Sequence, residues 1–330
     1  AESTRLRGVG RAAGMHAPLV VIGLDGATLD LIGPWVADGS LPHLAGLLAR
    51  GAWGRLRSTI PAATFPAWTS LVTGVNPGRH GVLDFTERVP GTYRVRFVNG
   101  SRRRAAALWS RYTAAGLRST VLTVPGTYPP EPVDGVMVSG WDSPLTTAVD
   151  GSFVFPGTFF DEMTAAVGRV PFADFQEVDT GTGWHAQAIE RLLAGVARRT
   201  ALARFCLERA RSDFFMVVFG ESDTVAHHFW RFHDPRSPRH ATSAFAGAVG
   251  QVYRALDRAI GDIVAAAPAG ATVAIDSDAH RTDLLDLDSR KNTAPGGYSL
   301  GLHVAHRPFI FMSNTNTTMD VGTILHEGGH

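Results

Sequence analysis

The chain has 330 residues, of which 45% are hydrophobic, so it is long enough for one large core with an insertion or for two modest domains. Its 31 basic and 30 acidic side chains nearly cancel, which excludes a strong overall field that would attract a nucleic acid polymer or an anionic membrane. With the single cysteine Cys206 no internal disulfide can form, which fits a reducing compartment.

The first stretch, residues 1–17, carries arginines but no apolar run of the length that a signal peptide needs. We therefore expect an N-terminal extension or tag remnant without fixed structure, and a cytoplasmic protein. No window of the sequence approaches the about 20 apolar residues that span a bilayer, so we expect no membrane partner.

Apolar runs and helical patterns alternate along the rest of the chain. The runs typical of strands covered on both faces are Leu19–Leu24, Ser119–Val124, Gly135–Ser139, Phe214–Phe219, Thr272–Ile275 and Pro308–Met312. The helical patterns are Leu41–Arg50, Ala67–Thr73, Ala105–Ala115, Trp184–Arg211 and Ser243–Ala266. This alternation predicts an α/β fold with a doubly wound, mainly parallel sheet and helices on both faces. Residues 143–183 break the alternation, which predicts a small cap or insertion at the sheet edge.

Two polar residues stand where an α/β fold places its active site. Asp25 follows the first apolar run directly, and the carboxyl ends of strands gather ligands, so Asp25 is a candidate metal ligand with turn or cap formation as the alternative. Thr64 precedes Phe65 and Pro66, and proline favours the first turn of a helix, so Thr64 lies at or near a helix N-cap. A hydroxyl there faces the positive end of the helix, which suits a phosphate, although simple capping remains the alternative.

Further candidates follow later strands. Asp223 and His227 are four residues apart, so on a helix they share one face and can bind a single metal ion, whereas His228 and His233 fit surface or packing positions better. The last candidates form one group after the strand Thr272–Ile275 and before the final apolar run, namely Asp278, His280 and His303, with His306 as the alternative to His303.

Taken in order, these motifs resemble those of the alkaline phosphatase superfamily, and most closely those of its type I phosphodiesterase and nucleotide pyrophosphatase branch. The resemblance is carried by Gly-Leu-Asp-Gly at Asp25, by Thr-Phe-Pro-Ala-Trp-Thr-Ser at Thr64, and by Asp223 with His227. It covers nearly the whole chain after Ala17 and implies one catalytic domain over residues 18–330 with an alkaline phosphatase-like fold.

The resemblance also implies a site with two divalent metal ions, of which zinc is the usual occupant and manganese or another ion occurs in some relatives. One ion would be held by Asp25, Thr64, Asp278 and His280, and the other by Asp223, His227 and His303. The chain departs from the usual Ser-Asp-His-Gly pattern, because Ala279 stands between Asp278 and His280 and displaces the imidazole by one residue. This departure leaves open an altered, weakened or single-metal site.

The function implied is metal-dependent hydrolysis of phosphodiester or pyrophosphate bonds in a small, nucleotide-like phosphorylated substrate, through a phospho-threonine intermediate on Thr64. Two alternatives stay open: a phosphomonoesterase for a small phosphorylated metabolite, and a weakened family member that binds a phosphorylated ligand without turnover. Related diesterases place an asparagine shortly after the nucleophile helix, where this chain has Asp84 and Phe85. Asp84 is therefore a candidate substrate-binding residue, with turn capping as the alternative.

Overall fold

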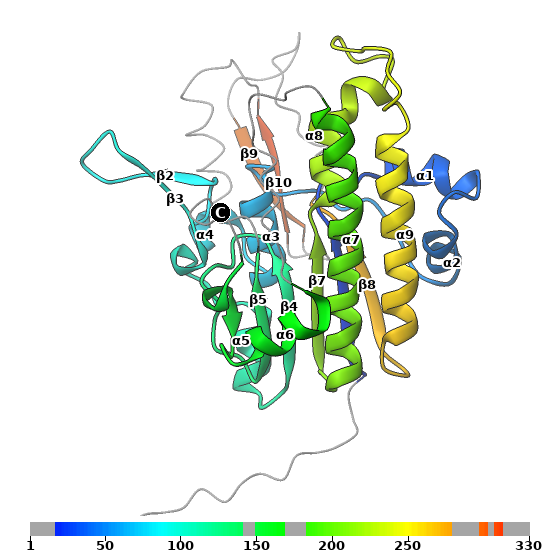
Figure 1. Ribbon diagram of the computed structural model, residues 1–330. Helices are drawn as coiled ribbons and strands as arrows, with labels where there is room; N and C mark the ends of the chain where they lie inside the picture. Colours follow the sequence, from blue (N-terminus) through cyan, green and yellow to red (C-terminus); the bar gives the residue numbers. More distant parts are fainter. Residues whose placement is uncertain (1–16, 141–148, 169–182, 279–296, 303–306, 313–330) are drawn as a thin grey trace, which may run out of the picture.

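A computed structural model describes residues 17–140, 149–168 and 183–278, and the strands 297–302 and 307–312. Most of these residues form one α/β body, in which a central sheet lies between helices (Figure 1). The sheet has six strands in the order β6-β5-β4-β7-β1-β8. They are β1 (Leu19–Leu24), β4 (Ser119–Val124), β5 (Gly135–Ser139), β6 (Val154–Phe155), β7 (Phe214–Phe219) and β8 (Thr272–Asp276).

The strands of this sheet run parallel, except that the short edge strand β6 pairs antiparallel with β5. Strand β1 lies between β7 and β8, and its register pairs Leu24 with Phe219 and Gly23 with Asp276. The three strands therefore end at the same edge of the sheet. This arrangement confirms the predicted α/β class with a mainly parallel sheet.

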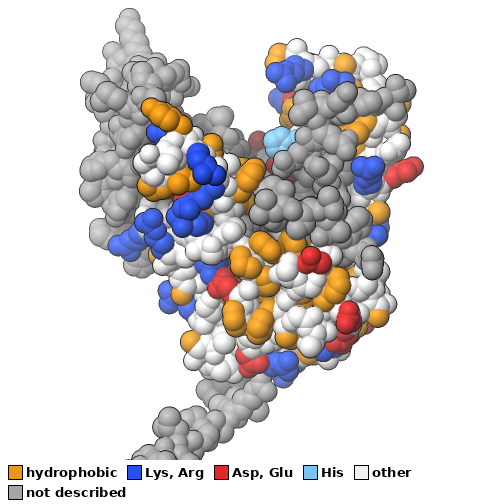
Figure 2. Space-filling model, turned by 60° about the vertical axis from the view of Figure 1, so that its left-hand side comes forward, with side chains coloured by type: hydrophobic (Ala, Val, Ile, Leu, Met, Phe, Trp, Pro, Cys, Tyr) orange, Lys and Arg blue, Asp and Glu red, His pale blue; other side chains and the backbone are white. Residues whose placement is uncertain are grey.

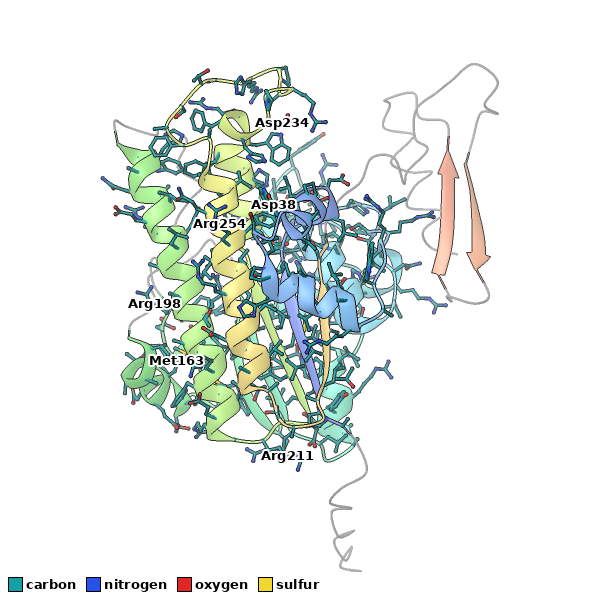
Figure 3. The ribbon with its side chains drawn as sticks, turned by 90° about the vertical axis from the view of Figure 1, so that its right-hand side faces the viewer. Asp38, Met163, Arg198, Arg211, Asp234 and Arg254 are labelled. Atoms are coloured by element: carbon teal, nitrogen blue, oxygen red, sulfur yellow. The ribbon has the colours of Figure 1, made fainter. Side chains whose placement is uncertain are left out.

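Helices cover both faces of the sheet because alternate strand side chains enter two apolar cores. Ile22 and Val217 belong to the larger core, whereas Val21 and Val218 belong to the smaller one. The larger core is covered by α1 (Leu29–Ala37), α2 (Pro42–Arg50), α6 (Phe159–Val167), α7 (Trp184–Arg209), α8 (Glu221–His233) and α9 (Ala248–Ala266). The smaller core is covered by α3 (Thr64–Thr73) and α5 (Leu108–Ala114). Figure 3 shows α7 and α9 running side by side on one side of the sheet.

Several element boundaries differ from the sequence prediction. Helix α9 begins at Ala248 rather than Ser243, because the chain makes a turn up to its N-cap, Gly247. The last predicted strand corresponds to β10 (Arg307–Met312), which pairs antiparallel with β9 (Gly297–Leu302) in a separate two-stranded sheet. The described part of the predicted insertion, residues 149–168, adds β6 to the sheet edge and α6 to the larger core.

A β-hairpin projects from the body near the short helix α4 (Pro77–His80) (Figure 1). Its strands β2 (Thr86–Arg88) and β3 (Val95–Phe97) pair antiparallel, and Tyr93 between them is 92% exposed. Figure 2 turns this side of the molecule toward the viewer and shows hydrophobic and basic side chains gathered together on it. Among the helices that the structure describes, none combines the length and the apolar character needed to cross a membrane.

Candidate metal centre

Asp25 is the best-fixed polar residue at the carboxyl edge of the sheet. It follows β1, its side chain is buried, and its backbone N–H donates to the Phe219 carbonyl of β7 at 2.9 Å. Ser222 Oγ donates to the Asp25 carbonyl at 2.6 Å, and Trp68 Nε1 donates to Asp25 Oδ1 at 2.8 Å. Residues from β7, α8 and α3 thus hold both the backbone and the carboxylate of Asp25.

Asp278 lies beside Asp25 although the two are far apart in sequence. The Gly26 N–H donates to Asp278 Oδ1 at 2.8 Å, and the two carboxyl groups share a side-chain hydrogen bond. Ser58 Oγ donates to the Asp278 carbonyl at 3.1 Å, which ties the segment before α3 to the same place. The structure therefore brings two acidic side chains together where strands β1 and β8 end.

Burial and mutual repulsion disfavour the charged forms of these carboxyl groups. Burial raises the pKa of Asp25 well above its usual value, and the charges of Asp278 and Asp223 raise it further. Burial also raises the pKa of Asp278, against the hydrogen bonds from Asp25 and the Gly26 N–H, and Asp223 again adds to the rise. A cation at this place would remove the repulsion.

The third carboxylate comes from the first turn of α8. A side chain at Gly26 would collide with Asp223, because an added Cβ would lie 2.8 Å from Asp223 Oδ1. Gly26 also has a φ of +64°, which suits glycine, so this position both turns the chain and admits the Asp223 carboxylate. One helical turn later, His227 Nε2 lies 3.4 Å from Asp223 Oδ1, and its bond to Asp223 raises the pKa of His227. The spacing of four residues thus places both side chains on one face of α8.

Thr64 is the first residue of α3, and the N-cap is Ala63, which makes no side-chain capping bond. Thr64 therefore lies next to the N-cap, as predicted, and is not itself the capping residue. Thr64 is half-buried, and Trp68 follows it by one helical turn on the same helix face. Because Trp68 bonds to Asp25, the helix beginning at Thr64 is held against the carboxyl end of β1.

Some of the remaining predicted residues lie among the described ones and others do not. Asp84 is exposed, and its Oδ1 accepts the N–H of the next residue, Phe85, at 2.7 Å. His228 and His233 contact aromatic rings, with centroid distances of 4.9 Å to Trp184 and 5.8 Å to Trp35. His280, His303 and His306 lie outside the described residues. Within the described ranges alone, no group of three or more His, Cys, Asp or Glu side chains is arranged to hold a metal ion.

Sequence reasoning missed a buried ion pair next to the centre. Glu221 opens α8 two residues before Asp223, is 4% exposed, and forms an ion pair with Arg199 of α7. Burial raises the pKa of Glu221, and the Arg199 charge opposes this rise. Helix α7 makes room for the carboxylate at Gly195, where an added Cβ would lie 2.5 Å from Glu221 Oε1. The Glu221–Arg199 pair can be recognised only from the structure, because neither residue belongs to a sequence motif.

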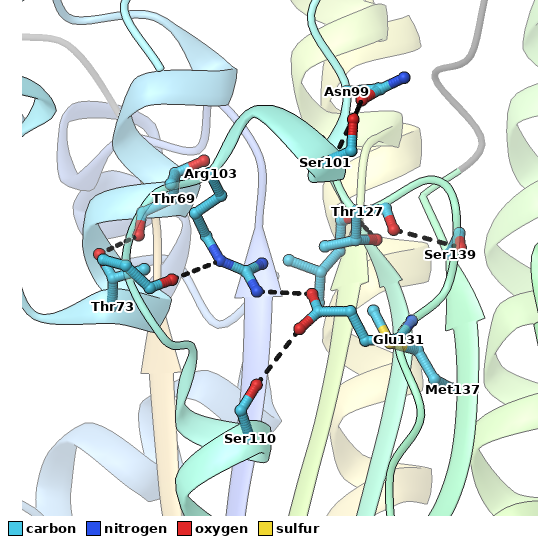
Figure 4. A network of polar contacts seen from close by, with 12 residues as sticks. Thr69, Thr73, Asn99, Ser101, Arg103, Ser110, Thr127, Glu131, Met137 and Ser139 are labelled. Atoms are coloured by element: carbon cyan, nitrogen blue, oxygen red, sulfur yellow. Dashed lines mark hydrogen bonds and ion pairs between the residues drawn. The ribbon is translucent and has the colours of Figure 1, made fainter. Parts of the chain in front are cut away.

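Buried polar contacts also hold helix α3 in place. His80 is fully buried and its Nε2 lies 2.8 Å from Ser70 Oγ of α3, while the Val82 N–H donates to its Nδ1 at 3.1 Å. Since Nδ1 accepts, the ring proton is on Nε2. Figure 4 shows a second network beside α3, in which Arg103 and Ser110 are both directed at the Glu131 carboxylate, at 2.6 and 3.2 Å.

His80 predicts a dependence of stability on pH. Burial lowers the pKa of His80 to about 4, from 6.5 for an ordinary histidine. The unfolded chain therefore takes up a proton first, so this stabilising contribution is complete above about pH 6.5 and is lost as the pH falls to about 4. We expect the free energy of unfolding to fall by about 2–3 kcal/mol over this window. The free energy of unfolding, measured by urea unfolding at several pH values, should depend less on pH in His80→Gln than in the wild type. An equal pH dependence in the two proteins would exclude His80 as the cause.

The fold and the acidic edge define the class of this protein. A mainly parallel sheet between helices, with carboxylates and a helix N-terminus at the carboxyl ends of its strands, is the alkaline phosphatase-like architecture. The sequence model described as type I phosphodiesterase / nucleotide pyrophosphatase matches residues 19–280, so the chain belongs to that family. This membership confirms the predicted resemblance and places the chain among phosphoester hydrolases.

Solved structures resemble this chain at low sequence identity, and the first of them supports the same fold. Phosphonoacetate hydrolase from Sinorhizobium meliloti, in complex with phosphonoacetate, is 15% identical with a TM-score of 0.52, over 93% of this chain and 72% of that one. Murine ectonucleotide pyrophosphatase / phosphodiesterase 5, an inactive threonine-to-alanine variant in complex with AMP, is 13% identical with a TM-score of 0.49. The match covers 93% of this chain and 69% of that one. No curated protein sequence matches the chain.

Proposed function

We propose that the chain is a metal-dependent hydrolase of phosphodiester or pyrophosphate bonds in a small phosphorylated substrate, with Thr64 as the nucleophile. The observation that carries the proposal is the meeting of Asp25, Asp278 and Asp223 beside the α3 helix that begins at Thr64. Family membership supports the general chemistry, phosphoester hydrolysis. The small ligand in the phosphonoacetate hydrolase structure supports a small substrate.

The donor chemistry of this edge fits a divalent cation. Burial and the charge of Asp223 raise the pKa of both Asp25 and Asp278, which a cation would reverse, and His227 adds an imidazole next to Asp223. Carboxylate oxygens and imidazole nitrogens are ligands that zinc accepts, and manganese also binds such oxygens. Asp25 and Asp278 would hold one ion and Asp223 with His227 another, and His280 and His303 remain proposed ligands.

Divalent cations held there would neutralise phosphoryl oxygens and lower the pKa of the Thr64 hydroxyl. Thr64 Oγ1 would attack phosphorus, form a phospho-threonine ester and release the leaving group through the broken P–O bond. Water would then attack the phospho-threonine, restore the hydroxyl and release the phosphate product. The free N–H groups in the first turn of α3 would stabilise the negative charge of the bound phosphoryl group.

Bond preference decides between the diesterase and the two alternatives. We expect turnover of bis-p-nitrophenyl phosphate to exceed that of p-nitrophenyl phosphate, and both to be lost after metal chelation and restored by zinc or manganese. A phosphomonoesterase would instead turn over p-nitrophenyl phosphate faster than bis-p-nitrophenyl phosphate. In that case Asp84 would also lose its proposed role in substrate binding. Phosphate binding without turnover of either compound by the metal-loaded protein would support the weakened member.

A further inference from the structure

A tryptophan outside any expected ligand set controls the geometry of Asp25. Trp68 Nε1 donates to Asp25 Oδ1 at 2.8 Å, with Trp68 1% and Asp25 6% exposed. An indole N–H is only a donor, so it engages one lone pair of Oδ1 and draws electron density from that oxygen, which makes Oδ2 the better ligand for a cation. Water cannot compete for the buried Oδ1, which makes the bond a persistent constraint on how Asp25 binds.

The indole ring is buried and packs closely against strands β1 and β7. The ring lies against Gly23 of β1, where an added Cβ would be 2.5 Å from the ring carbon Cη2. Val218 of β7 borders the same space, because its Cγ2 would be 2.8 Å from the same added atom. The absence of a side chain at Gly23 therefore admits the ring, and the surrounding core holds it in the orientation that donates to Asp25.

Asp278 is constrained in the same way by a different donor. Its Oδ1 accepts the Gly26 N–H at 2.8 Å. Each of the two carboxylates thus has one oxygen held by a protein donor. Each carboxylate of this pair offers one oxygen to a shared cation and disfavours binding the cation with both of its oxygens.

We propose that Trp68 is a positioning residue that sets the metal preference of this site by limiting Asp25 to one ligating oxygen. The inference rests on the proposed function, in which a metal ion binds at Asp25 and Asp278. Zinc is satisfied by four ligands, whereas calcium takes 6–8 oxygens and commonly uses both oxygens of a carboxylate. A site whose carboxylates are restricted to single oxygens favours zinc over calcium.

The test compares two tryptophan-to-phenylalanine variants. Trp68→Phe removes the donor and keeps an aromatic ring, and Trp109→Phe is the matched control. Trp109 belongs to the same core and is fully buried, and its Nε1 has no hydrogen-bond partner among the described residues. Dissociation constants for Zn²⁺ and Ca²⁺ alone are measured by competition with chelating dyes. We expect Trp68→Phe to weaken zinc binding by about 10–100-fold and to lower the zinc-to-calcium affinity ratio, because outer-shell donors contribute by that amount.

The outcomes separate this inference from the proposed function. An unchanged affinity ratio in Trp68→Phe, or an equal change in Trp109→Phe, overturns the role of Trp68 while zinc binding by the wild type leaves the proposed function standing. A wild type that binds neither ion overturns both. If Trp68→Phe does not fold, site-specific replacement of Trp68 by benzothienylalanine removes the N–H at nearly constant ring volume, and the same ratio decides.

Discussion

Thr64→Ala is expected to lower kcat by at least about 10³-fold, since loss of an attacking group leaves only the residual catalysis of the site. The variant keeps the fold, because Ala63 is the N-cap of α3 and alanine is the best helix former. It also keeps most of the metal, because carboxylates and imidazoles supply most of the proposed ligands. Thr64→Ser should retain measurable turnover, since it keeps a hydroxyl at the same place.

Steady-state kinetics and metal analysis on the three proteins check this expectation. Incubation with substrate followed by rapid acid quench adds a direct measurement, because the wild type and Thr64→Ser should trap phosphate on residue 64 and Thr64→Ala should not. A rate within a few-fold of the wild type for Thr64→Ala would remove Thr64 from the mechanism and point to a water molecule as the attacking group.

Asp25→Asn is expected to act in opposite directions on metal binding and on the stability of the metal-free protein. It removes the charge of a proposed ligand, so zinc affinity should fall by more than the roughly 10–100-fold that outer-shell changes cause. It also removes repulsion from Asp278 and Asp223 at a buried position, where burial raises the pKa of Asp25. The metal-free variant should therefore unfold at a higher temperature than the metal-free wild type.

Thermal unfolding with and without zinc measures both effects in one experiment. The added zinc should stabilise the wild type much more than Asp25→Asn, because only a bound ion shifts the unfolding equilibrium. Asp213→Asn is a suitable control, since Asp213 precedes β7 at the opposite edge and bonds to the Arg118 N–H at 2.8 Å. Equal stabilisation of the wild type and of Asp25→Asn by zinc would place the metal elsewhere.

The sequence predicts the sheet and the position of the acidic edge because both depend on local patterns. The buried runs of β1 and β7 are continuous and apolar, and Asp25 follows one of them directly. The spacing of Asp223 and His227 likewise fixes their shared helix face once α8 is known to be a helix. Their roles as metal ligands, and that of Asp278, stay predictions.

Features that depend on contacts between distant segments could not be predicted in this way. Helix α1 was missed because Pro34 stands inside it, and proline ordinarily ends a helical pattern. The bond from Trp68 to Asp25 depends on the space left by Gly23, and the Glu221–Arg199 pair depends on the approach of α7 to α8. Neither approach leaves a periodic signal in the sequence, since each joins elements that meet only in the finished fold.

The central place of β1 between β7 and β8 determines when the site can exist during synthesis. Leu19 pairs with Phe214 on one side and with Thr272 on the other, so the neighbours of the first strand are made long after it. Such non-local pairings form slowly, and a growing chain carries Asp25 without its acidic companions until α8 and the end of β8 have been made. A nascent chain shorter than about Asp278 therefore lacks the proposed pair of carboxylates for its first ion. On the proposed function, capture of that ion would therefore follow completion of the sheet.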